Sequence, residues 1–69
     1  MPVIYVITPT YQRVEQIAEL LRLGQTLLHI PSLHWIVVED SSSLSPNVAE
    51  LLHRLAIPYT HLYGKSNSN

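Results

Sequence analysis

The chain has 69 residues, enough for one small domain, and its formal net charge at pH 7 is −1, which gives no electrostatic reason to expect nucleic acid or an anionic membrane as a partner. It contains no cysteine, which excludes disulfides and thiolate metal sites. No apolar run approaches the roughly 20 residues that a membrane-spanning helix needs.

The first predicted element is a strand within residues 2–11. Residues 3–7 are apolar and mostly β-branched without strict alternation, which indicates a strand buried on both faces of a parallel sheet. Pro9 has no N–H to donate to a central ladder, so we expect this strand to end near Thr8.

An amphipathic helix is predicted next, from Gln12 to about Leu28. Thr10 is a candidate N-cap for this helix. Gly24 lies inside the pattern and predicts close packing of the helix on the sheet. Pro31 ends the helix, because the residue before a proline is disfavoured in the α conformation. The apolar residues recur with a period near 3.6 and are Val14, Ile17, Ala18, Leu20, Leu21, Leu23, Leu27 and Leu28.

The second half repeats the alternation of strand and helix. Residues 34–40 form an apolar strand that ends on two acids and a turn-forming run of serines. The pair Ser45-Pro46 predicts the start of a short helix, which ends before Pro58. Residues 59–63 predict a third strand, and residues 64–69 a polar, disordered tail.

The order βαβαβ predicts an α/β fold with parallel strands and right-handed crossovers. If the strand order is 3-2-1, both helices lie on one face of the sheet and leave the other face bare. Parallel sheets normally have helices on both faces. We therefore expect the chain to be the start of a larger domain, half of a nucleotide-binding α/β unit.

A candidate nucleotide site lies at the carboxyl ends of the first two strands, where open α/β sheets bind ligands. The turn Thr8–Tyr11 follows the first strand, and the following helix start offers N–H groups to a phosphate. Tyr11 offers a ring for base stacking, worth about 1–3 kcal/mol in comparable contacts. Asp40, at the end of the second strand, offers an acceptor for the N3–H of uracil or for a ribose hydroxyl.

Each of these residues also has a purely structural interpretation. Asp40 precedes three serines and is equally compatible with capping a turn. Tyr11 is compatible with packing over the end of the sheet, and Pro9 and Thr10 with breaking the strand and capping the helix. Arg13 is placed to reach a phosphate or to be a solvated helix residue.

Other ligand classes are disfavoured. The chain has two glycines and neither of the glycine-rich phosphate-binding patterns, so NAD and P-loop sites are not expected. The histidines do not recur at helical spacing, which argues against a metal cluster and favours structural or surface roles; they are His29, His34, His53 and His61.

Six segments resemble, in sequence and order, the opening of the β-1,3-glucuronyltransferases. The combination of the Thr-Pro-Thr-Tyr turn with Leu-His-Trp and Val-Glu-Asp is specific. The resemblance covers residues 2–62, and after Leu62 we expect the sequence to leave the family pattern. The segments are residues 6–11, 13, 18–20, 25–27, 33–40 and 59–62. The first of them is Val6-Ile7-Thr8-Pro9-Thr10-Tyr11, and the last is Tyr59-Thr60-His61-Leu62.

This resemblance implies a GT-A (Rossmann-like) glycosyltransferase fold, with residues 1–63 as the N-terminal UDP-binding part of a truncated domain. It implies an inverting enzyme that transfers glucuronate from UDP-glucuronate to a terminal galactose of the glycosaminoglycan linker or of glycoprotein glycans. It also implies a manganese ion, a type II Golgi membrane protein and often a homodimer. By position, Pro9, Thr10 and Tyr11 match the family's UDP-binding turn, and Asp40 matches its uracil-binding aspartate.

Other family features are missing from this chain. The family holds manganese on a run of aspartates and uses a glutamate as base, both further downstream, whereas Asp40 is the only aspartate here and the four glutamates do not match the base. We also expect these 69 residues not to include the family's N-terminal membrane anchor. We therefore expect no catalytic and no metal residues, and no activity of the chain alone. The alternative is a non-catalytic α/β module that binds a nucleotide weakly or pairs with a full-length relative.

Overall fold

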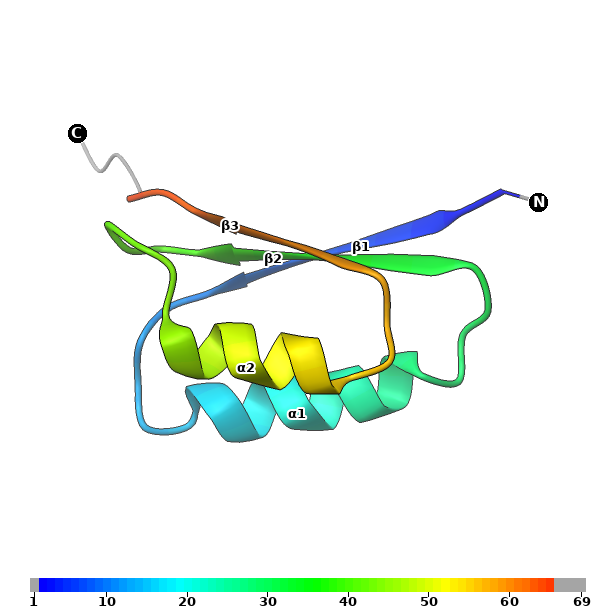
Figure 1. Cartoon of the computed structure of the whole chain (residues 1–69), viewed down its shortest axis with the longest axis horizontal. Coiled ribbons are helices and arrows are strands. Elements are labelled where there is room, and N and C mark those ends of the chain that lie inside the picture. The colour runs from blue at the N-terminus through cyan, green and yellow to red at the C-terminus, as the bar shows by residue number, and fades with distance from the viewer. Residues whose placement is uncertain (1, 66–69) are drawn as a thin grey trace.

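The structure is a computed structural model and describes residues 2–65. Strands and helices alternate, and the three strands form one parallel sheet in the order β1-β2-β3. Both helices lie side by side in a layer on one side of this sheet (Figure 1). The predicted parallel α/β arrangement is confirmed. The elements are β1 (Ile4–Thr10), α1 (Gln16–Leu27), β2 (Leu33–Glu39), α2 (Pro46–Arg54) and β3 (Tyr59–Tyr63).

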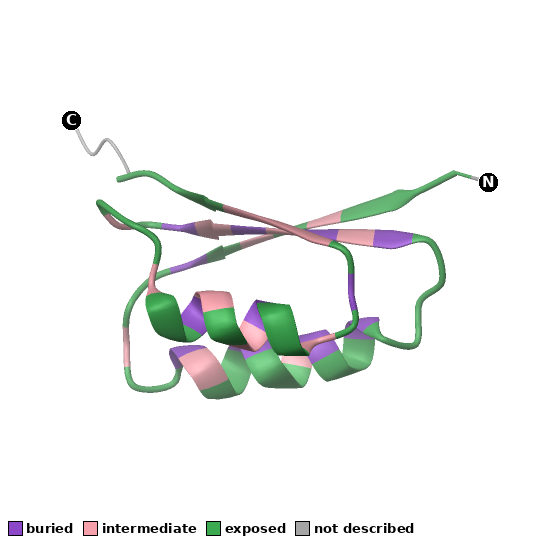
Figure 2. Cartoon of the chain, in the orientation of Figure 1, coloured by how far each residue is buried: buried purple, intermediate pink, exposed green. Residues whose placement is uncertain are grey.

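The core lies between the sheet and the helix layer. Alternate residues of β2 are buried toward the helices, and Trp35 and Val37 are fully buried (Figure 2). This alternation follows from the period of two along a strand, which places every second side chain on one face. The other buried apolar residues come from both helices, from the start of β2 and from the segment before β3, and they are Leu20, Leu27, Leu33, Val48, Leu52 and Ile57.

β1 is an edge strand and is much more exposed than its sequence indicates. Tyr5 is 64% exposed and Ile7 is 65% exposed. Both pair with β2 residues that face away from the helices, and no element within residues 2–65 covers that face. The prediction of a strand buried on both faces is therefore wrong for β1, whereas the expectation of a bare face is confirmed.

Pro9 does not end the strand, contrary to the prediction. It lies inside β1 opposite Val38. Ile4 N–H donates to Ser32 O, and Asp40 N–H donates to Thr10 O. The even-numbered residues of β1 thus bond to β2, and the nitrogen of Pro9 points to the open edge, where no N–H is needed.

α1 begins four residues later than predicted. Its first residue is Gln16, with Glu15 at the N-cap position. Val14, assigned by its spacing to the buried stripe, is 97% exposed. Thr10 belongs to β1 and caps no helix; instead its hydroxyl accepts a hydrogen bond from Gln16 Nε2 at 3.2 Å.

Close packing at Gly24 is confirmed. A Cβ atom at this position would lie 2.5 Å from Leu55 Cδ1 and 3.2 Å from Trp35 Cζ3. The first distance is shorter than real Cβ contacts show, so a larger residue at position 24 would have to displace the end of the Leu55 side chain and would crowd Trp35.

The second half of the chain follows the sequence analysis closely. α2 begins with Pro46 at its first turn after Ser45 at the N-cap, although the Ser45 side chain makes no capping hydrogen bond. β3 has the predicted bounds. Gly64, the first residue of the predicted tail, donates its N–H to Glu39 O at 2.9 Å, and residues 66–69 lie outside the described part.

Candidate functional site at the carboxyl edge of the sheet

The carboxyl ends of β1 and β2 meet at one edge of the sheet. Thr10 is the residue paired with Glu39, and Asp40 N–H donates to Thr10 O at 2.8 Å. Tyr11 is the next residue along the chain. The structure therefore brings the turn after β1 and Asp40 together, at the edge where open α/β sheets bind ligands.

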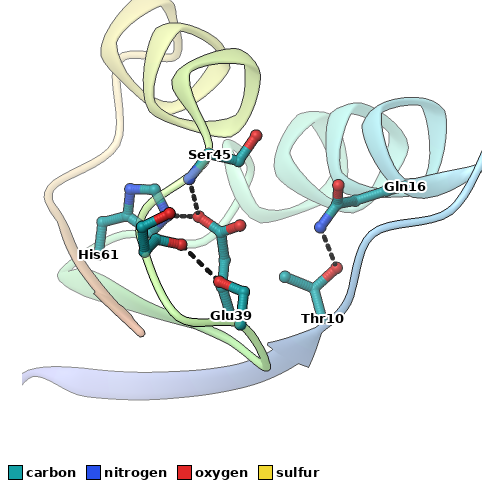
Figure 3. A network of polar contacts seen from close by, with 7 residues as sticks. Thr10, Gln16, Glu39, Ser45 and His61 are labelled. Atoms are coloured by element: carbon teal, nitrogen blue, oxygen red, sulfur yellow. Dashed lines mark hydrogen bonds and ion pairs between the residues drawn. The ribbon is translucent and has the colours of Figure 1, made fainter. Parts of the chain in front are cut away.

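Three of the four predicted UDP-binding residues present their side chains to solvent. Pro9 and Asp40 are exposed, and Tyr11 is 53% exposed. Thr10 is buried, because its hydroxyl is turned toward α1 and bonded to Gln16 (Figure 3). Any contact of Thr10 with a ligand would therefore come from its backbone.

Arg13 holds the Tyr11 ring and is itself held by Glu19. The guanidinium carbon lies 4.4 Å from the centre of the Tyr11 ring, a cation–π geometry. Arg13 Nη2 donates to Glu19 Oε1 in the first turn of α1. The Glu19 carboxylate, and to a smaller extent Tyr11, raises the pKa of Arg13, so the guanidinium keeps its charge. Sequence reasoning missed this arrangement, for which the only signal was the proximity of an aromatic and a basic residue in one turn.

Glu39 points away from Asp40, as strand alternation predicts, into the helix side of the sheet. It is 3% exposed and accepts hydrogen bonds from His61 Nε2 at 2.5 Å and from Ser45 N–H at 2.8 Å (Figure 3). These contacts join the end of β2 to β3 and to the start of α2. His61 thus has a structural role, which is one of the two roles, structural or surface, that were expected for the histidines. The pairing itself was missed, although Val37 pairs with His61 and Glu39 lies two residues further on the same face.

A hollow of about 350 Å³ opens beside this edge. Gln12, Glu39 and residues 41–47 line it, so its walls carry serine hydroxyl groups from the loop between β2 and α2 and the side-chain amides of Gln12 and Asn47. Two further hollows, of about 240 and 220 Å³, lie at the amino end of the sheet and between the helices. Of these three hollows, only the one of about 350 Å³ is lined by the sequence neighbours of Tyr11 and Asp40, which are Gln12 and Ser41. Tyr11 and Asp40 themselves do not line it.

The described residues do not suit a metal ion. Within residues 2–65, no group of three or more His, Cys, Asp or Glu side chains is close enough together to hold one. This part of the chain therefore does not fit the manganese that the resemblance implies. Within the same residues, no helix is long and apolar enough to cross a bilayer.

Comparison with known proteins identifies relatives along the whole chain. A galactosylgalactosylxylosylprotein 3-beta-glucuronosyltransferase of Caenorhabditis elegans (sqv-8) is 54% identical over 68 residues, which are 99% of this chain and 19% of the relative. The human galactosylgalactosylxylosylprotein 3-beta-glucuronosyltransferase 1 is 49% identical over 69 residues, or 100% of this chain and 21% of the relative. Drosophila melanogaster enzyme S is 53% identical over 90% of this chain and 15% of its own length. The chain thus spans about a fifth of the curated relatives it matches.

The sequence model of glycosyltransferase family 43 matches residues 23–69, more than half of the chain. This match, and the relatives aligned over all 69 residues, correct the expectation that the sequence leaves the family pattern after Leu62. The chain belongs to glycosyltransferase family 43.

Proposed function

We propose that the chain is the uridine-binding part of a GT-A, Rossmann-like glucuronosyltransferase domain. One observation carries the proposal: the hydrogen bond from Asp40 N–H to Thr10 O places an exposed aromatic ring and a carboxylate at the same strand ends. The chain around them is 49–54% identical to enzymes named as 3-beta-glucuronosyltransferases.

The chemistry of these groups suits a uridine nucleotide. The Asp40 carboxylate is an acceptor for the N3–H of uracil, which cytosine lacks. The exposed Tyr11 ring gives a base a surface for stacking. Hydroxyl and amide groups around the neighbouring hollow are suitable partners for ribose hydroxyls.

The reaction belongs to the longer protein. In this proposal an acceptor galactose hydroxyl attacks the anomeric carbon of UDP-glucuronate, the C–O bond to UDP breaks, and a base takes the hydroxyl proton, with inversion at the anomeric carbon. In this proposal the base, the manganese ligands and the Golgi membrane anchor belong to other parts of the longer protein, which we expect to be a homodimer. We expect the 69-residue chain to give no turnover with UDP-glucuronate and a galactose-terminated acceptor.

A non-catalytic role is the second candidate, favoured by the open edge of β1. Tyr5 and Ile7 are exposed on the uncovered face of this strand, and an unpaired edge is a template for pairing with another chain. In this case the chain would be a small α/β module that pairs with a full-length relative.

The two proposals are separated by titrating the ¹⁵N-labelled chain with UDP and following its backbone amides by NMR. The uridine site predicts shifts confined to residues 8–13 and around Asp40. It also predicts their loss in Asp40→Ala but not in Glu50→Ala, an exposed acid on α2. Spectra that do not change with UDP, from a chain that co-sediments with a full-length relative, would overturn the uridine site and support the pairing module.

A further inference from the structure

We propose that Arg13 and Glu19 are positioning residues that hold the Tyr11 ring ready to receive a nucleobase. This inference rests on the proposed function and adds two residues to its site. It starts from the geometry of Tyr11, whose ring is more than half exposed just beyond the last residue of β1.

The support for the ring comes from the first turn of α1. Glu19 belongs to the helix, and its backbone N–H is bonded to Glu15 O at 2.9 Å. Its carboxylate accepts a hydrogen bond from Arg13, whose guanidinium lies over the ring of Tyr11. A helix thereby holds the ring through two side chains.

The guanidinium covers one face of the ring. A planar base stacks on one face of an aromatic ring, so the opposite face of Tyr11 stays open to it. Immobilising a flexible side chain on binding has an entropic cost. Because Arg13 already orders the Tyr11 side chain before binding, a base that stacks on the ring does not incur this entropic cost.

An alternative role for Arg13 is a direct contact with the nucleotide phosphates. The ion pair with Glu19 opposes it, since the carboxylate is bonded to Arg13 Nη2 and compensates the charge of the guanidinium. The two roles make opposite predictions for Glu19→Gln. Under the phosphate role, loss of the carboxylate would free Arg13 and strengthen UDP binding. Under the positioning role, it would loosen Tyr11 and weaken binding of every uridine compound.

The test measures dissociation constants of the 69-residue chain for uridine and for UDP by amide NMR. For Glu19→Gln we expect both constants to rise by the same factor, roughly two- to tenfold, the equivalent of ordering one side chain. In a Tyr11→Leu background, the same substitution should have no effect, because no ring is left to position. Dispersed amide spectra show that each variant is folded.

A matched control is available on α2. Arg54 and Glu50 form another exposed ion pair, with Nη2 to Oε2 at 3.3 Å, and Glu50→Gln should leave both constants unchanged. Tighter UDP binding by Glu19→Gln, unchanged binding, or an equal effect without the Tyr11 ring would each overturn the inference while leaving the uridine site standing. Failure of the unaltered chain to bind uridine would overturn the proposed function, and the inference with it.

Discussion

The buried contact between Glu39 and His61 leads to a quantitative prediction for stability. The His61 and Glu39 side chains are only 6% and 4% exposed, and the carboxylate accepts from His61 Nε2 and from Ser45 N–H. His61→Leu removes the first of these bonds and leaves the carboxylate buried. Breaking a buried pair from one side costs about 3–5 kcal/mol. A chain of 69 residues has a total stability of roughly 3–10 kcal/mol, so this variant should lose a third of it or more.

The charge on Glu39 accounts for much of that loss. Glu39→Gln keeps an oxygen for Ser45 N–H and removes the charge. In this background His61→Leu leaves only a neutral buried amide without its partner, which costs about 1–3 kcal/mol of stability. We therefore predict that the same substitution is about 2 kcal/mol less destabilising when the residue at position 39 is glutamine.

This difference is measured by unfolding each variant in urea. The probe is the fluorescence of Trp35, which is the single tryptophan and is fully buried. A fixed concentration of trimethylamine oxide keeps every variant of the cycle folded at zero urea, because this osmolyte favours buried surface. Equal losses from His61→Leu with glutamate and with glutamine at position 39, within about 0.5 kcal/mol, would refute the buried-charge argument.

Two backbone positions give further predictions. Ser32, between α1 and β2, has a φ of 56°, so Ser32→Gly should relieve left-handed strain and stabilise the fold by up to about 1 kcal/mol. Ser42→Gly is the control, because Ser42 has no positive φ, and it should not stabilise the fold. A lower urea midpoint for Ser32→Gly would contradict this prediction. Gly24→Val should destabilise the fold by about 1–3 kcal/mol, because its side chain would displace the end of Leu55 and crowd the buried Trp35 ring, whereas Gly64→Val, whose Cβ meets open space, should be neutral. Equal midpoints for the two variants would show that the neighbours of Gly24 can move away.

Local signals in the sequence were sufficient for the second half of the fold. The pair Ser45-Pro46 marks the start of α2 because proline suits the first helical turn, and β3 follows from a short β-rich run after Pro58. They misplaced the start of α1, since Val14 has helical spacing but lies in an exposed loop. Spacing shows where a helix can extend, and only packing shows where it begins.

Features that depend on strand order or on distant side chains were beyond the sequence pattern. A proline is excluded from a central strand but tolerated in an edge strand. Pro9 can therefore lie within β1 only because β1 is at the edge of the sheet, which the sequence around Pro9 does not show. The placement of Asp40 beside the turn after β1 was predicted, because parallel strands share a carboxyl edge. The bond between Arg13 and Glu19 was not, because it depends on the path of the loop between β1 and α1.

Base preference tests the uridine site most directly. Titrating the chain with uridine and with cytidine compares a base that donates from N3 with one that accepts there. Because the Asp40 carboxylate can only accept, we predict that uridine binds about tenfold more tightly, as expected for a partly solvated hydrogen bond to a charged group. Asp40→Asn, which can donate as well as accept, should bring the two affinities within about twofold. Equal binding of both nucleosides by the unaltered chain, or a uridine preference that survives Asp40→Asn, would contradict the assignment of Asp40 to the base.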